Sequence, residues 1–87
     1  KEEAQTIQIR LKPGEAIKRH ITYTDVFFYV LEGKGIVEIG DEKEEVEKDT
    51  LIESPEGIHH CWYNESEEDL RILVVKAPRP KNKAKLL

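Results

Sequence analysis

The chain has 87 residues, one cysteine and a formal net charge of −4 at pH 7, which is the size of a single small domain. One cysteine excludes a disulfide within the chain and is typical of a reducing compartment, so we expect a cytoplasmic protein in which Cys61 is a buried structural thiol. No apolar run approaches the roughly 18 residues that a membrane-spanning helix needs. The charged share of 37% and the absence of methionine are typical of heat-adapted proteins, so we expect a thermostable fold.

The charges are unevenly distributed along the chain. Residues 38–69 hold thirteen acidic and two basic side chains, whereas residues 76–87 hold five basic and no acidic ones. The acidic stretch argues against a nucleic-acid-binding surface there. The basic end lacks interleaved aromatic residues, so we expect a solvated tail, or one that lies against the acidic middle of its own chain or of a partner chain. We predict one domain over residues 1–78, a basic tail over 79–87, and no nucleic-acid or membrane partner.

Apolar residues alternate with polar ones along most of the chain, and this period of two predicts β-strands. Turns that contain glycine or proline separate the segments. The stretches 26–31 and 70–75 are apolar on both faces, so we expect both of their faces to be covered. No stretch convincingly predicts a helix, and about eight short strands indicate a β-sandwich or β-barrel. The expected strands cover residues 6–11, 16–24, 26–31, 36–39, 44–48, 49–54, 58–64 and 70–75.

Two of the three histidines lie in the segment PEGIHHCWYN, residues 55–64. Adjacent residues of a strand point to opposite faces, so His59 and His60 cannot both enter one pocket. If the face of His60 and the face of His20 meet inside a barrel, these two histidines approach each other. The alternation then predicts a mostly apolar small-molecule pocket lined by His20, Thr22, Thr24, Val26, Phe28, His60 and Trp62.

Two motifs, in this order and at this separation, make the chain resemble the cupins, which are small antiparallel β-barrels of the jelly-roll type. The first family motif is glycine, five residues, His-x-His, three or four residues, glutamate, six residues and glycine. Gly14, His20 and Gly33 match it. The second motif closes as Pro-x-Gly-x-x-His-x-x-x-Asn, and it is matched in full by Pro55, Gly57, His60 and Asn64. The resemblance covers residues 7–76 and implies an all-β cupin barrel.

The resemblance also implies a metal site of three histidines and one glutamate, and the chain departs from that site. His20 and His60 occupy the first and last histidine positions, but Thr22 replaces the second histidine and Val26 the glutamate. A hydroxyl is a poor ligand for Zn, Ni, Fe, Mn or Cu, and valine is no ligand. The two histidines therefore form an incomplete candidate site for a divalent transition metal. Three carboxylates are candidate replacement ligands, and each would need a bulge or a strand end to turn it into the barrel: Asp25, Glu32 and Glu53.

Four roles stay open at the level of sequence. The first is a binding module that holds a small molecule in the barrel without a stoichiometric metal, and the retained histidine pair with lost chelating residues motivates it. The second is a metal-dependent enzyme, a dioxygenase, isomerase or lyase, with a reduced histidine-based site. The third is a metal-free enzyme that uses His20 or His60 as a general base. The fourth is a protein whose role is to interact with other chains.

Self-association is also expected. The stretches 26–31 and 70–75 would leave an apolar outer face made of Phe27, Tyr29, Leu73 and Val75. Such a face needs a cover, and cupins commonly pair through their sheets. We predict a homodimer.

Overall fold

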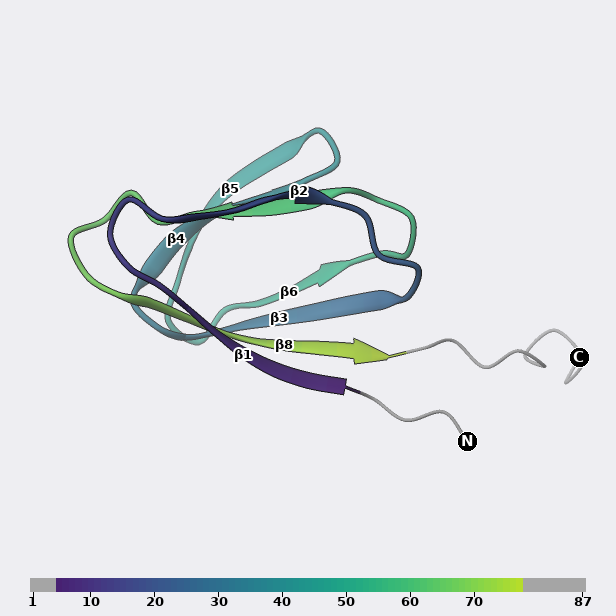
Figure 1. The fold of residues 1–87 in the computed structure, drawn as a ribbon, viewed down its shortest axis with the longest axis horizontal. Helices are drawn as coiled ribbons and strands as arrows, with labels where there is room; N and C mark the ends of the chain where they lie inside the picture. The colour runs from purple at the N-terminus through teal and green to yellow at the C-terminus, as the bar shows by residue number, and fades with distance from the viewer. Residues whose placement is uncertain (1–4, 78–87) are drawn as a thin grey trace, which may run out of the picture.

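The computed structural model describes residues 5–77, which form eight β-strands in two four-stranded antiparallel sheets, stacked as two layers (Figure 1). One sheet has the strand order β1-β8-β3-β6 and the other β2-β7-β4-β5. The described residues contain no helix, and therefore none that could cross a membrane. The strands are β1 (Gln5–Leu11), β2 (Ala16–His20), β3 (Asp25–Glu32), β4 (Lys34–Ile39), β5 (Glu42–Glu47), β6 (Leu51–Ser54), β7 (His60–Tyr63) and β8 (Leu70–Ala77).

The all-β architecture expected from the alternation is confirmed, and its two four-stranded antiparallel sheets are consistent with the jelly roll that the resemblance implies. β3 shows why the alternation was informative: Val26, Phe28 and Val30 are buried, whereas the residues between them are half-buried on the outer face. β3 lies between β8 and β6 in its sheet, so its backbone is paired on both sides. The predicted basic tail, residues 79–87, lies outside the described residues, and the proposed domain boundary stays a prediction.

The core fills the space between the two sheets. Trp62, Leu70 and Ile72 have no exposed surface, and the rings of Phe28 and Trp62 meet edge to face with their centroids 5.4 Å apart. A Cβ atom on Gly35 would collide with Cδ2 of Leu70. Only glycine at this position therefore lets β4 approach the core so closely.

The second expected strand is wrong in length. It was predicted over residues 16–24, but β2 ends at His20, and the next four residues form a loop. This loop is tied to the turn before β7, because the backbone N–H of Gly57 donates to the carbonyl of Thr22 over 3.0 Å. A side chain adds to the tie, since Oδ1 of Asp25 accepts a hydrogen bond of 2.9 Å from the backbone N–H of Glu56. Loop contacts thus replace strand pairing at this end of the barrel.

β2 also contains a bulge. Ile17 pairs with Trp62 and His20 pairs with His60, so three steps along β2 match two steps along β7. Trp62 and His60 lie on the inner face of β7. Because of the extra residue, Ile17 and His20 both lie on the inner face of β2, where regular alternation would have placed them on opposite faces.

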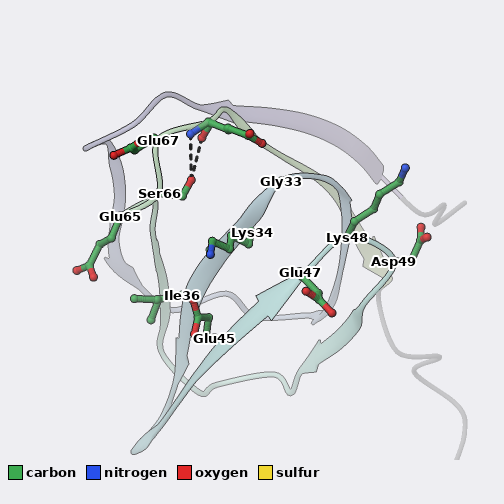
Figure 2. Close-up of a pocket in the computed structure, with 12 residues that line it drawn as sticks. Gly33, Lys34, Ile36, Glu45, Glu47, Lys48, Asp49, Glu65, Ser66 and Glu67 are labelled. Carbon is green, nitrogen blue, oxygen red and sulfur yellow. Dashed lines mark hydrogen bonds between the residues drawn. The ribbon is translucent and has the colours of Figure 1, made fainter.

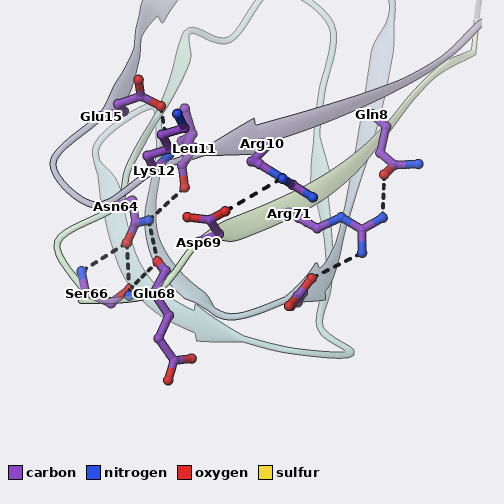
Figure 3. A network of polar contacts seen from close by, with 11 residues as sticks. Gln8, Arg10, Leu11, Lys12, Glu15, Asn64, Ser66, Glu68, Asp69 and Arg71 are labelled. Carbon is purple, nitrogen blue, oxygen red and sulfur yellow. Dashed lines mark hydrogen bonds and ion pairs between the residues drawn. The ribbon is translucent and has the colours of Figure 1, made fainter.

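The other end of the barrel is fixed by Asn64, which is 1% exposed. Its Nδ2 donates to the carbonyls of Leu11 (2.9 Å) and Glu68 (2.8 Å). Its Oδ1 accepts hydrogen bonds from the backbone N–H (3.0 Å) and the hydroxyl (2.7 Å) of Ser66 (Figure 3). The asparagine of the second motif therefore shapes the loop between β7 and β8 and takes no part in the histidine site.

Candidate functional site

The two histidines of the motifs meet inside the barrel. The Nε2 atoms of His20 and His60 are 3.2 Å apart, and the rings meet edge to face with centroids 4.4 Å apart. His60 is 2% exposed, whereas His20 is exposed at the end of the barrel where the loops 21–24 and 55–59 lie. The pair therefore has a buried member and a member open to solvent.

The hydrogen bonds assign one direction to the pair when both rings are neutral. Nδ1 of His20 lies 2.9 Å from the carbonyl oxygen of Lys18, and a carbonyl only accepts, so this nitrogen carries hydrogen and Nε2 carries the lone pair. His60 must then donate from its own Nε2 to that of His20. Its Nδ1 is left as an acceptor and takes the hydroxyl hydrogen of Ser54 over 2.9 Å. Hydrogen bonds thus run from buried Ser54 through both rings to Lys18.

The surroundings of His60 favour its neutral form. Its ring packs edge to face on Phe28, with centroids 5.2 Å apart. Burial, followed by the positive charges of His20, Lys76 and His59, lowers the pKa of His60 from 6.5 to about 4. His60 is therefore a neutral hydrogen-bonding group at neutral pH.

The structure places the other five predicted pocket residues in two groups. Val26, Phe28 and Trp62 are 1%, 3% and 0% exposed and belong to the packed core beneath the histidines. Thr22 and Thr24 lie in the loop after β2, where the Thr22 hydroxyl donates to the Thr24 carbonyl over 3.1 Å. Two buried polar atoms of these five side chains, the Thr24 hydroxyl and Nε1 of Trp62, have no hydrogen-bond partner within residues 5–77. The seven-residue pocket stays a prediction.

Lys76 is the residue that sequence reasoning missed. It follows the buried residues Ile72 and Val74 on β8 with the same period of two and lies opposite Val26 of β3, which puts it on the inner face. It is half-buried. Extension of the expected strand 70–75 by one residue would have identified it as an inward-facing lysine.

The residues of the pair do not make a complete metal site. Two Nε2 atoms 3.2 Å apart could both contact one ion at the usual Zn–N distance of about 2.0–2.1 Å. The third and fourth family positions offer only the Thr22 hydroxyl and the apolar Val26. Residues 5–77 contain no group of three or more His, Cys, Asp and Glu side chains suited to a metal ion. A resident metal of the family type therefore does not fit this donor set.

The carboxylates that were considered as replacement ligands are engaged elsewhere. Asp25 binds the backbone of the loop before β7. Glu53 is exposed and pairs opposite Phe27, on the outer face of β6. Glu32 forms an ion pair of 3.1 Å with Arg71 on the outside of the barrel. None of the three joins the histidine pair in a group suited to a metal ion.

Hollows of the described structure lie away from the seven predicted residues, and two of them differ in where they lie relative to the histidine pair. One of about 370 Å³ opens at the seam between the edge strands β5 and β6, and its lining residues are Val37, Ile39, Glu42, Glu44, Ile52, Glu53, Pro55 and Ile58. The other, of about 830 Å³, is a surface hollow on the outer side of β4 and β5, rich in glutamate (Figure 2). Its lining residues are Gly33, Lys34, Gly35, Ile36, Glu45, Glu47, Lys48, Asp49, Glu65, Ser66, Glu67 and Glu68.

The seam hollow borders the histidine level of the barrel. Ile39, one of its walls, pairs opposite His60 across β4 and β7, and residues directly opposite each other share a face. Ile52, another wall, pairs opposite Phe28. The seam hollow therefore reaches the inner face that carries the histidine pair, whereas the glutamate-rich hollow lies on the outer face of its sheet.

Comparison with known proteins agrees with this geometry. Residues 7–76 match the family model for the cupin domain. A solved structure of a Thermus thermophilus protein is 36% identical, with 84% of this chain and 70% of that chain covered and a TM-score of 0.78. A Bacillus halodurans protein is 30% identical, with 88% and 64% covered and a TM-score of 0.82.

A third similar structure, the cupin domain of Schizosaccharomyces pombe Cnp3, is 21% identical, with 100% of this chain and 66% of that chain covered and a TM-score of 0.86, a likeness of fold alone. The chain thus spans between 64% and 70% of the length of these three structures. No curated protein matches at a significant level. Because the family model covers most of the chain and both histidine motifs lie within it, this chain belongs to the cupin family.

Proposed function

We propose that this cupin domain binds a small organic molecule at the end of its barrel, beside His20 and His60. The observation that supports the proposal is the oriented pair itself. An exposed imidazole contacts a buried one, and Ser54 and the Lys18 carbonyl hold the two rings from either side. A site that combines apolar walls with a few fixed polar groups is the usual design of a small-molecule pocket.

A metal-dependent enzyme is the second candidate, and the donor set does not favour it. Two imidazoles are fewer than the three protein ligands of catalytic zinc sites and lack the carboxylate of the non-haem iron sites. Such an enzyme would need a further ligand from a partner chain or from the substrate. Metal content of untagged protein, purified without a metal column, tests this candidate. About one metal ion per chain that is lost in His60→Ala would establish it against the first proposal.

The proposed binding site is tested by NMR on protein labelled in histidine and tryptophan, kept in a chelator and screened against a panel of small organic molecules. We expect ligands that shift the His20, His60 and Trp62 side-chain signals together. These shifts should disappear in His20→Ala, which removes an exposed ring and leaves the core intact. The matched control is His59→Ala, which removes a ring that alternation places on the other face of β7. Ligands that bind equally well to both variants would refute the site.

We further propose that the chain forms a homodimer in which the outer face of the β1-β8-β3-β6 sheet packs against a second copy. Phe27 pairs opposite Val75, and Tyr29 opposite Leu73, so these half-buried side chains form one apolar strip across two strands. Leu51, opposite Tyr29 on β6 and 64% exposed, widens the strip. Contiguous exposed apolar surface of this kind marks interaction sites.

A further inference from the structure

The strand registers place two rows of side chains at one level of the barrel. On one sheet, Lys76 lies opposite Val26, and Val26 lies opposite Ser54. On the other sheet, His20 lies opposite His60. The hydrogen bond of 2.9 Å between Ser54 and His60 joins the two rows. Lys76 and the histidine pair are therefore at the same depth, at the end of the barrel where β8 ends (Figure 1).

The charge of Lys76 has no counterion within residues 5–77. The ion pairs of this part of the chain join Arg10, Arg19 and Arg71 to carboxylates, and none includes Lys76. Lys76 nevertheless acts on the histidine site, because its charge is one of the causes that lower the pKa of His60. A half-buried ammonium thus faces a pair of imidazoles across an apolar strand residue, Val26.

The inward-facing carboxylates lie on the far side of the barrel. Glu42 and Glu44 point to the inner face from the edge strand β5, since they pair opposite Ile39 and Val37. β4 and its residue Ile39 separate Glu42 from His60. On the inner face, the side of the barrel that holds Lys76 and the histidines therefore carries only cationic and neutral polar groups among its described residues. Asp25 lies at the same end on the outer face of β3 and accepts from the backbone N–H of Glu56.

Residues 5–77 contain three buried side-chain polar atoms without a hydrogen-bond partner, namely Nδ1 of His59, Nε1 of Trp62 and the Thr24 hydroxyl. Nε1 of Trp62 can only donate, and the Thr24 hydroxyl can donate as well. Both are buried, and neither has a partner in the described part of the chain. Buried donors without acceptors are unfavourable, so they point to an acceptor that residues 5–77 do not supply.

We propose that the ligand of this barrel is a small organic anion, whose negative group lies between Lys76 and the His20–His60 pair. The inference rests on the proposed function and names its ligand class. Lys76 supplies the charge, and the Thr24 hydroxyl supplies a directional hydrogen bond. Charge-assisted hydrogen bonds of this kind are stronger than neutral ones.

The test compares ligands that share a shape and differ in charge. Benzoate and benzamide are titrated into the labelled wild-type protein, with acetate and inorganic phosphate as smaller anions, and the His20, His60 and Trp62 signals are followed. We expect benzoate to bind and benzamide to bind about ten- to a hundredfold more weakly. Lys76→Met, which keeps the apolar stem of the side chain, should lower the affinity for benzoate by a similar factor. The control Lys48→Met removes an equal charge in the glutamate-rich hollow and should leave benzoate affinity unchanged.

The outcomes separate this inference from the proposed function. Equal affinities for benzoate and benzamide, equal effects of the two lysine variants, or no binding by any of the anions would each overturn the anion inference. If neutral molecules of the wider panel still shift the histidine signals, the proposed binding site survives without its anionic ligand. If no molecule shifts them, both proposals are refuted. A loss of benzoate binding confined to Lys76→Met supports both.

Discussion

Acid should destabilise this fold through His60, and the structure allows the size of the effect to be worked out. The pKa of His60 is lowered from 6.5 to about 4, chiefly by burial. Between these pH values the unfolded chain binds a proton at this position and the folded chain does not, so the free energy of unfolding must fall as the pH falls. Each pKa unit is worth about 1.4 kcal/mol. The loss from His60 alone is therefore about 2 kcal/mol at pH 5 and about 3 kcal/mol at pH 4.

The measurement is urea unfolding of the wild type and of His60→Gln at pH values from 7 to 4, in the presence of a chelator. The many carboxylates of the chain titrate in both proteins, so their contribution cancels when the two pH profiles are subtracted. The variant starts from a lower stability at pH 7 because it disturbs the bond to Ser54. Between pH 7 and 4 it should then lose about 3 kcal/mol less than the wild type.

A second readout follows the proton directly. NMR titration of the His60 ring in the folded protein should give a midpoint near 4. Parallel pH profiles for wild type and variant, or a midpoint near 6.5, would show that His60 is not held neutral in a buried site. The described direction of the hydrogen bonds from Ser54 to His20 would then have to be abandoned.

Three further changes test other parts of the structure. Phe27→Glu should convert a dimer to monomer or insoluble protein in light scattering, and an unchanged dimer would remove the proposed interface. Gly33→Ala should destabilise the fold by more than Gly14→Ala. Both glycines have a positive φ, but only at Gly33 would a Cβ atom collide with a carbonyl oxygen, that of Asp69. Equal losses of stability in thermal unfolding would contradict this prediction. Asn64→Asp should cost about 3 kcal/mol or more in urea unfolding, because it sets a carboxylate against two carbonyls, and a smaller loss than that of Ser66→Ala would disprove the role given to Asn64.

The fold could be predicted because alternation was decisive along most of the chain. In β3 and β8, buried and half-buried residues follow the period of two that the sequence displays. The end of β2 could not be predicted, since Ile21, Thr22 and Thr24 have strand propensity. Their backbone is instead tied to the turn before β7, a long-range contact that no local pattern reports.

The candidate site was predictable in its centre and not in its surroundings. The motifs identified His20 and His60 as partners, and their nitrogen atoms do meet. Ser54 carries no signal of its own, because a serine before a turn proline is ordinary turn chemistry. Lys76 was overlooked since the apolar run ends before it, and charged residues at strand ends usually face solvent.

The bulge in β2 makes the orientation of His20 depend on how many residues precede it. Deleting one residue between Ile17 and His20 would give regular pairing with the imidazole still opposite His60, whereas regular pairing of the present residues would set Arg19 opposite His60 and turn the His20 imidazole to the other face. When related chains are aligned, a histidine in the right column is therefore an insufficient criterion. Whether the strand before that histidine is bulged or regular has to agree with the length of the segment.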